Sequence, residues 1–424
     1  MTAPRSPPSI GARPCRVLWI TDEFPPAVGG TGAIAYQLSN GLARQGLDVQ
    51  VVTRQTVPPS PLQERCGDVP VRRLPPPGLL KGAGWRALPL LVRYVMRLAR
   101  LLVRDARQFD LVIVSGMKII PLAAVPVCRM LGKKTIVRIE SPFEILQPIS
   151  SESLSAMHGP AGRLLLQALK RLQAAVLRRA TCVVAISTEI TELLGRPELR
   201  HGRVVKIPNA VDVERFKPVS AAAKSALRAQ LGIPPSKSVF VNVGRLTRSK
   251  GMLTLMAAWS EIVARHDDAL LVVLGGGKGY WDDCEDELVE YIRTHRLEGH
   301  VQLVGPSDRV HEYLQAADLF ISPSEYEGFA LTLLEALSCA LPVLSTTVGE
   351  AAYVIREGRT GFLFPPKDVQ ALEASLEAAF ERRAQWPEMG REARESALPF
   401  DLTRVSERYA ELCRELVGSG AAPP

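Results

Sequence analysis

Two glutamates, Glu327 and Glu335, lie eight positions apart in the segment PSEYEGFALTLLE (323–335). Gly328 and Phe329 predict a tight turn, and the following ALTLLEAL is typical of a helix start. Because an α-helix has 3.6 residues per turn, eight residues span a little over two turns, so both carboxylates are expected on roughly one side. The free N–H groups of a first helical turn favour an anion. An anion flanked by two carboxylates matches the layout of a sugar nucleotide, whose diphosphate lies between hydroxyls.

Two cations follow the first strand expected in the second half of the chain. Arg245 and Lys250 lie in VGRLTRSKG (243–251), between Gly244 and Gly251. A planar guanidinium and a compact ammonium together suit a diphosphate. Two solvated loop cations are the alternative, but the flanking glycines favour phosphate binding.

Glycine-rich loops follow two other expected strands. In GGTG (29–32), the backbone at Gly30 and Gly32 can approach a ligand closely, and the helix expected behind it favours an anion. The loop does not match G-x-G-x-x-G, so it can equally be a tight connection. GGGKG (275–279) either lines a nucleotide or turns the chain.

Nothing in the sequence predicts a metal site. The acidic stretch WDDCEDE (281–287) falls on an expected surface helix, where solvated charge is the simpler interpretation. No isolated D-x-D follows a strand, and none of the six histidines has a nucleophile context. We therefore expect no metal site and assign no catalytic role to any histidine.

The elements that must position these residues alternate between strand and helix. Five strands are expected in the first half, at 15–21, 48–53, 110–116, 134–140 and 182–187, and a helix at 33–46. Six are expected in the second half, at 237–246, 269–277, 300–305, 318–324, 341–346 and 360–364. Short apolar strands separated by helices predict parallel sheets covered on both faces. The fold class is therefore α/β, with two Rossmann-like doubly wound domains facing a central cleft.

Composition limits the compartment and the partner. The seven scattered cysteines form no C-x-x-C pair, which fits a reducing compartment. The Pro-, Ser- and Arg-rich start lacks a signal peptide's apolar segment, and no charge-free run of 18 apolar residues predicts a membrane span. Residues 1–200 carry a charge balance of +14 and residues 201–424 one of −6. We expect a cytoplasmic protein whose basic half either faces an anionic partner or is simply solvated.

Residues 85–104 predict a basic amphipathic helix. Five arginines fall on one face at helical spacing, namely Arg86, Arg93, Arg97, Arg100 and Arg104. The opposite face carries Leu88, Leu91, Val95, Leu98 and Leu102. Such a helix either covers the sheet and exposes a solvated arginine stripe, or attracts anionic lipid head groups or a lipid-diphosphate acceptor.

Three motifs occur together and in order: GG-x-G in the first half, then VGRL-x3-KG and EGF-x5-E in the second. This set resembles the family-4 retaining glycosyltransferases of GT-B fold (glycosyl transferases group 1). Further matching stretches are CVVAIS, KIPNAVDVERFKP, AADLFISPSEYEGF, LPVLST and GRTGFL. The similarity runs from about residue 16 to 416 and is densest after residue 181.

The resemblance implies a nucleotide sugar as donor, no metal or other cofactor, and retention of the anomeric configuration. Arg245, Lys250 and Glu327 would be the catalytic residues, the cations stabilising the leaving nucleotide and the glutamate contacting the transferred sugar. Glu335 would hold the ribose. The backbone at Ala330, Leu331 and Thr332, where the helix containing Glu335 begins, would lie along the phosphates. The donor-binding set is Gly30, Gly32, Gly275, Gly305, Ala330, Leu331, Thr332 and Glu335.

The resemblance also implies a domain plan. A tail at 1–14 precedes an acceptor-side domain at 15–205, a hinge at 206–218 that includes Asn209 and Asp212, and a nucleotide-sugar-binding domain at 219–400. A final helix, 401–418, would return to the first domain and end in a flexible tail at 419–424.

One stretch departs from the family pattern. Where members often carry a histidine, VRIESPFE offers Glu140 or Ser141, with Arg138 two residues before the glutamate. A carboxylate cannot donate as a neutral imidazole does. Glu140 would either contact the acceptor or a sugar hydroxyl, or only pair with Arg138.

We therefore expect a glycosyltransferase that acts on a lipid-linked or polysaccharide precursor at the cytoplasmic membrane face, with no nucleic-acid partner. The alternatives are a soluble enzyme with a small-molecule acceptor, an epimerase or other enzyme of the same fold, and a binding module without activity. The intact set of Glu327, Glu335, Arg245 and Lys250 argues against the last.

Overall fold

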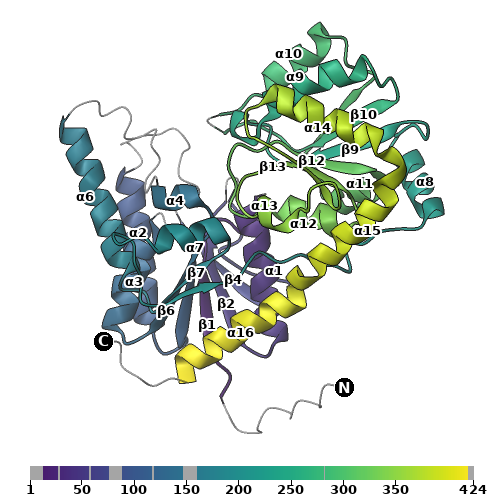
Figure 1. Ribbon diagram of the computed structural model, residues 1–424. Coiled ribbons are helices and arrows are strands. Elements are labelled where there is room, and N and C mark those ends of the chain that lie inside the picture. Colours follow the sequence, from purple (N-terminus) through teal and green to yellow (C-terminus); the bar gives the residue numbers. More distant parts are fainter. Residues whose placement is uncertain are drawn as a thin grey trace.

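The computed structural model describes residues 13–26, 29–56, 59–75, 88–116, 119–146, 160–280 and 282–418. They form two α/β lobes, each built on one mainly parallel sheet (Figure 1). The predicted fold class of two Rossmann-like domains is confirmed. The arginine at position 86 and the terminal tails, apart from residues 13 and 14, lie outside the described ranges.

The N-terminal lobe contains the first sheet. In spatial order its strands are β3 (Gln63–Cys66), β4 (Val69–Leu74), β2 (Asp48–Arg54), β1 (Arg16–Ile20), β5 (Leu111–Ser115), β6 (Lys134–Ile139), β7 (Cys182–Ala185) and β8 (Val204–Lys206). Its helices are α1 (Gly30–Arg44), α2 (Leu88–Arg104), α3 (Ile120–Met130), α4 (Pro142–Leu146), α6 (Pro160–Leu177) and α7 (Thr188–Leu194).

The C-terminal lobe contains the second sheet, in the order β11 (Val301–Gly305), β10 (Ala269–Leu274), β9 (Ser238–Val243), β12 (Leu319–Ser322), β13 (Val343–Thr346) and β14 (Gly361–Phe364). Its helices are α8 (Ala221–Gln230), α9 (Met252–Val263), α10 (Glu285–Thr294), α11 (Val310–Ala316), α12 (Leu331–Ser338), α13 (Ala351–Val354), α14 (Val369–Glu381) and α15 (Trp386–Ala397). Short 3-10 turns are η2 (Arg248–Lys250), η3 (Arg383–Gln385) and η4 (Leu398–Phe400), and the last helix is α16 (Leu402–Gly418).

Both sheets reverse their strand order next to their first strand. In the second sheet β9 lies between β10 and β12, and in the first sheet β1 lies between β2 and β5. Ligands of open α/β sheets bind at the carboxyl ends of the strands that flank such a reversal. The GGTG loop follows β1, and VGRLTRSKG follows β9, so the topology brings both predicted loops to a reversal point.

Alternating burial explains why helices cover both faces of the first sheet. Val17 and Trp19 of β1 pack in a cluster with α1 and α16, whereas Leu18 and Ile20 pack with α2 and α3. Because successive strand residues point to opposite faces, one apolar strand serves two helix layers. The β3–β4 pair, however, is an antiparallel edge that the sequence pattern did not predict.

The last helix returns to the N-terminal lobe. In Figure 1, α15 and α16 (yellow) run from one lobe to the other, and α16 packs against α1. The strand-like contact between Val211 and Asp401 pairs the outgoing and returning crossings. Within the described ranges, no helix has the length and apolarity needed to traverse a bilayer.

Candidate active site

Lys250 and Glu327 meet where the strand order of the second sheet reverses. Lys250 ends η2 after β9, and Glu327 lies between β12 and α12. The Lys250 ammonium donates to Oε1 of Glu327, and the Ser324 hydroxyl donates to the same oxygen at 3.1 Å. Each side chain of the ion pair is about one-fifth exposed, so the pair is partly shielded from water but accessible. The structure thus brings two predicted catalytic residues into direct contact.

A glycine permits this contact. Gly251 has φ +68°, and a Cβ added to it would lie 1.9 Å from the carbonyl oxygen of Pro323. The η2 turn therefore packs directly on the chain that leads to Glu327, and Glu325 N–H donates to the Ser249 carbonyl at 3.0 Å. Only glycine fits both the left-handed conformation and the close backbone approach.

Two acids, one just before and one at the start of α10, bond to loop amides near this turn. Asp282 is 5% exposed, and its carboxylate accepts from the Ser249 N–H at 3.2 Å. The Glu285 carboxylate accepts from the Gly277 N–H at 2.7 Å. The prediction of solvated charge is therefore wrong for these two acids, because each one satisfies a loop amide beside the site.

Arg245 lies over an aromatic ring of its own lobe. Its guanidinium lies 4.8 Å from the centre of the Tyr280 ring. Burial raises the pKa of Tyr280, Arg245 opposes that shift, and Glu23 from the N-terminal lobe adds to it. Arg245, Tyr280 and Glu23 therefore share one electrostatic environment between the lobes.

The two glycines of the GGTG loop have different surroundings. A Cβ on Gly30 would meet no atom within 4 Å, and the residue is exposed at the first turn of α1. A Cβ on Gly32 would come within 3.3 Å of the backbone of Glu23 and Phe24. The geometry thus leaves Gly30 open to a ligand, while Gly32 allows the preceding loop to pack on the helix.

The start of α12 is suited to an anion. Ala330 is its N-cap, no side chain bonds to the cap, and the first turn, which includes Leu331 and Thr332, contains no acid. All three residues are partly exposed. Unpaired N–H groups and the helix dipole make such an end favourable for phosphate.

Glu335 lies farther along the same helix. The residue is partly exposed, yet desolvation of its carboxyl raises its pKa to about 7, an effect that Arg215 opposes. Among the described residues its carboxylate has no hydrogen bond or ion pair. A carboxyl with a pKa near neutrality both accepts and donates hydrogen bonds, which suits a pair of hydroxyls.

Gly275 follows β10, and Gly305 is the last residue of the neighbouring strand β11. Gly275 has φ +134°, a Cβ on it would lie 1.7 Å from the Gly244 carbonyl, and its N–H donates to the Gly305 carbonyl at 2.9 Å. Gly275 is thus required for the packing of two strand ends. A Cβ on Gly305, in contrast, would meet no atom within 4 Å.

The predicted acceptor-side residues lie at the end of β6. Arg138 is completely buried and bonds to Glu140, Asn209 and Tyr409, so its assignment as an acceptor contact is corrected to an internal anchor. Of the two interpretations of Glu140, the ion pair with Arg138 is the one observed. Ser141 is partly exposed, and its carbonyl accepts from the Glu144 N–H at 3.1 Å.

A contact between the lobes was not predicted from the sequence. Glu350, 4% exposed, belongs to the C-terminal lobe, and its carboxylate accepts from the Thr188 N–H at 2.7 Å and from the Lys206 ammonium. Thr188 begins α7 and Lys206 ends β8, both in the N-terminal lobe. No local pattern marks Glu350, because its partners are more than 140 positions away.

The arginine stripe of α2 is partly solvated and partly bonded. Arg93 and Arg100 are exposed, whereas Arg97 donates to the Pro75 carbonyl at 2.8 Å and Arg104 pairs with Asp105. The packing face includes Tyr94, Leu98, Leu101 and Leu102. The exposed face also carries apolar residues that the sequence pattern did not single out, namely Val92, Met96 and Val103, about half exposed.

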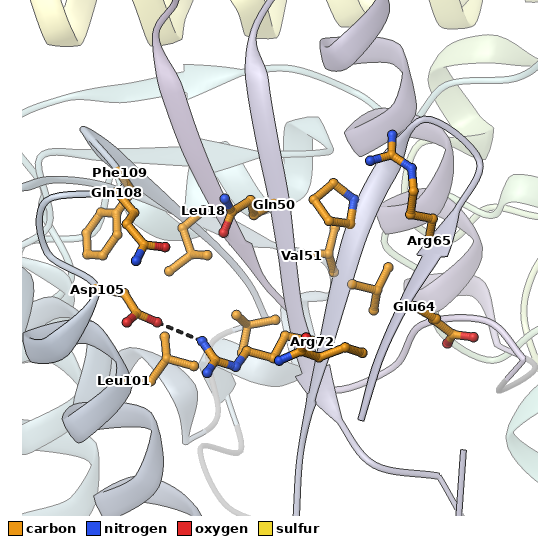
Figure 2. Close-up of a pocket in the computed structure, with 14 residues that line it drawn as sticks. Leu18, Gln50, Val51, Glu64, Arg65, Arg72, Leu101, Asp105, Gln108 and Phe109 are labelled. Carbon is orange, nitrogen blue, oxygen red and sulfur yellow. Dashed lines mark hydrogen bonds and ion pairs between the residues drawn. The ribbon is translucent and has the colours of Figure 1, made fainter. Parts of the chain in front are cut away.

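A hollow of about 470 Å³ lies elsewhere, beside β2, β4 and the end of α2 (Figure 2). It contains the ion pair between Arg72 and Asp105, 2.7 Å apart. None of the predicted site residues lines it. It adjoins the end of α2 that leads into β5, away from the carboxyl ends of the strands, so we do not place the active site there.

Comparisons with known proteins agree with this arrangement. Residues 29–210 match the family model described as "Glycosyl transferase 4-like domain", and residues 223–396 match "Glycosyl transferases group 1". A D-inositol 3-phosphate glycosyltransferase of Kineococcus radiotolerans is 28% identical over 421 residues, 93% of this chain and 92% of that protein. An alpha-maltose-1-phosphate synthase of Mycolicibacterium smegmatis is 29% identical over 249 residues, 56% of this chain and 64% of that protein.

Solved structures share the fold. Sucrose-phosphate synthase from Thermosynechococcus elongatus has a TM-score of 0.78 at 23% identity, covering 96% of this chain and 100% of that one. Anabaena Alr3699/HepE in complex with UDP-glucose has a TM-score of 0.70 at 20% identity, covering 94% and 99%. The two family models follow one another along most of the chain, and each falls on one of the two lobes. The chain therefore belongs to the family-4 glycosyltransferases of GT-B fold, the glycosyl transferases group 1.

Proposed function

We propose that this glycosyltransferase moves a sugar from a nucleotide-diphosphate sugar to a hydroxyl acceptor and retains the configuration at the anomeric carbon. The observation that carries the proposal is the contact between Lys250 and Glu327 at the point where the second sheet reverses its strand order. An ammonium and a carboxylate that touch each other can bind the two ends of one scissile bond, the phosphate and the sugar.

The nucleotide would lie along the C-terminal lobe. The diphosphate would accept hydrogen bonds from the first turn of α12, near Ala330 and Thr332, with Arg245 on its other side. Glu335, one turn farther on, would hold the ribose hydroxyls. The open backbone at Gly30 would approach the phosphate or the sugar from the N-terminal lobe.

The chemical step then needs mainly electrostatic help. As the bond between the anomeric carbon and the diphosphate oxygen breaks, negative charge grows on that oxygen, and fixed positive groups lower the barrier. The Lys250 ammonium would shift from Glu327 to the phosphate. The released Glu327 carboxylate would accept a hydroxyl of the transferred sugar.

Retention follows if attack and departure occur on the same face. The acceptor oxygen would bond to the anomeric carbon as the diphosphate leaves, and the leaving phosphate oxygen would take the acceptor proton. Lys250, Arg245 and the helix end supply the positive charge for this step from the protein itself, and we propose that no bound metal or other cofactor is required.

For the acceptor we propose a lipid-linked saccharide or polysaccharide precursor at the cytoplasmic face of the membrane. The exposed face of α2 supports this, because it sets Val92, Met96 and Val103 beside Arg93 and Arg100. Exposed apolar side chains on one side and basic side chains next to them are typical of a helix that lies in a membrane interface. Each basic residue near an anionic surface adds about 1 kcal/mol of binding.

A small phosphorylated acceptor is the second candidate. The relative named D-inositol 3-phosphate glycosyltransferase, similar over most of both chains, supports it. The two candidates differ in one measurement. Lipid-linked acceptors would be used only on vesicles, whereas a small acceptor would be used equally well in solution.

A thermal-shift screen against nucleoside diphosphates and their sugars tests the donor, because a ligand of the native state raises the melting temperature. We expect one nucleotide to stabilise wild type and to stabilise Glu335→Gln less. Release of nucleotide that depends on acceptor then separates transfer from epimerisation. A screen without any stabilising nucleotide would contradict the proposed donor class.

A further inference from the structure

Arg138 joins three separate parts of the chain inside the protein. Its Nε donates to the Tyr409 hydroxyl of α16 at 3.0 Å. One terminal nitrogen donates to the Glu140 carboxylate, and the other to the side-chain oxygen of Asn209. A buried guanidinium is costly to desolvate unless all its donors are bonded, so these partners hold one another in a fixed arrangement.

Asn209 extends the chain of contacts into the other lobe. It lies in the segment that connects the lobes, is 5% exposed, and its side-chain N–H donates to the Phe329 carbonyl at 2.6 Å. Phe329 is two residues after Glu327 and two before the start of α12. A single side chain therefore ties the connecting segment to the loop between the proposed catalytic glutamate and the phosphate-binding helix end.

Two further contacts hold the same loop in place. A Cβ on Gly328 would lie 2.2 Å from the Glu140 carbonyl, so the loop touches the end of β6 directly. The Phe329 ring packs edge-on against the ring of Phe400, with 5.2 Å between the ring centroids. Phe400 lies where the chain crosses back to the N-terminal lobe. Both segments that connect the lobes therefore contact Phe329, the first through Asn209 and the second through Phe400.

We propose that Arg138 and Asn209 are positioning residues for Glu327. Through the hydrogen bond from Asn209 to the Phe329 carbonyl, they make the position of Glu327 depend on the relative arrangement of the two lobes. The inference rests on the proposed function of Glu327. The segment from Glu327 to Ala330 belongs to no helix or strand, so its backbone position depends on such anchors. A displacement of about 1 Å at a reacting group costs on the order of 100-fold in rate.

The first test is Asn209→Ala with Asn40→Ala as a matched control. Asn40 is also buried, 3% exposed, and its side-chain amide also makes two hydrogen bonds, one to the Tyr36 carbonyl at 2.9 Å and one from the Asp68 N–H at 2.5 Å. Neither of these hydrogen bonds reaches the 327–335 segment. We expect Asn209→Ala to lower kcat at least about 10-fold with nucleoside diphosphate Kd changed less than about 3-fold, and Asn40→Ala to change neither by more than about 3-fold.

A second pair of variants addresses Arg138 without removing a buried charge. Tyr409→Phe deletes only the hydroxyl that accepts from Arg138, and it keeps the ring that packs against Trp19, with centroids 6.2 Å apart. Arg138→Lys keeps the charge but cannot reach three partners at once. We expect kcat to fall in both, more for Arg138→Lys, again with a smaller change in Kd. Tyr409→Phe also serves if the arginine variant does not fold.

Hydrogen exchange provides a measurement that does not depend on turnover. Amides of residues 325–335 should exchange faster in Asn209→Ala than in wild type and Asn40→Ala. Equal kcat losses in the two alanine variants, or unchanged exchange at 325–335, would overturn the inference. A wild-type protein that transfers no sugar from any nucleotide would instead refute the proposed function, while the exchange data would still decide whether Asn209 anchors the loop.

Discussion

Lys250 and Glu327, 77 positions apart in the chain, form an ion pair at the carboxyl ends of β9 and β12. Ser324 donates to the carboxylate that Lys250 also contacts. Because the strand order of the sheet reverses between these two strands, the pair lies where this fold binds its ligands.

Lys250→Ala and Glu327→Gln should each lower kcat by about 10²–10³-fold, the usual effect of removing one transition-state stabiliser. Because the two groups act together, the double variant should lose little more than either single variant. Initial rates with saturating donor measure this. Lys367→Ala is the control, since Lys367 pairs with Glu325 of the same loop at 3.1 Å but is mostly exposed. Near-wild-type rates in both site variants would refute the assignment.

Gly251→Ala should destabilise the protein and also reduce activity. The substitution adds the cost of a left-handed alanine, about 1 kcal/mol, and a clash with the Pro323 carbonyl that displaces Lys250. Gly232→Ala is the matched control, because Gly232 has the same φ of +68° but nothing within 4 Å of an added Cβ. The free energy of unfolding in urea and kcat should both be lower in Gly251→Ala than in Gly232→Ala. Equal effects would mean that the contact with Pro323 is unimportant.

Glu335 should make stability depend on pH. Its pKa is about 7 in the folded protein and 4.5 as the ordinary value, so between these pH values the native state binds more protons than the unfolded state. Stability from this group is therefore greatest below pH 4.5 and falls as the pH rises to about 7.

Glu335→Gln should remove that dependence. The difference in unfolding free energy, variant minus wild type, should rise between pH 5 and pH 8 and then level off, as measured by urea denaturation at each pH. A difference that does not change with pH would contradict the raised pKa.

Glu350→Ala should weaken the contact between the lobes. It leaves the Lys206 ammonium and the first N–H of α7 without their carboxylate, and we expect a loss of about 1–3 kcal/mol in unfolding free energy. Glu388→Ala is the control, because Glu388 pairs with Arg391 on the surface, where both side chains are more than half exposed, and should cost at most about 1 kcal/mol. Equal losses in unfolding free energy would show that Glu350 stabilises the protein no more than a surface acid does.

If the enzyme attaches to membranes as proposed, attachment should depend on the exposed face of α2. Reversal of Arg93 and Arg100 to glutamate should abolish co-sedimentation with anionic vesicles, and Val92→Ser with Met96→Ser should weaken it at any salt concentration. The control reverses Arg293 and Arg391 of the C-terminal lobe, both about 70% exposed, which changes the net charge equally. Equal loss in the two reversal variants would indicate a general charge effect, and no loss in either would refute the membrane site.

The sequence by itself determined the local elements and the residues of the motifs. Apolar runs of strand length alternate with helical periodicity, and both depend only on neighbouring residues, so the two parallel sheets were predicted correctly. Arg245, Lys250, Glu327 and Glu335 follow from motif spacing in the same way. The edge pair β3–β4 was missed, because β3 (QERC) is only four residues long and mostly polar, and β4 (VPVRRL) contains a proline and two arginines among its apolar residues.

Only the tertiary structure decided which of these residues touch. The buried position of Asp282, the internal anchoring of Arg138 and the contact of Glu350 with Thr188 each depend on segments far apart in the chain. Asn209 reaches Phe329 across 120 positions. Such contacts arise when sheets and helices pack, and packing is set by the shape and burial of whole surfaces. Local spacing therefore selects the candidate residues of this site, whereas their pairing and their burial follow from the fold.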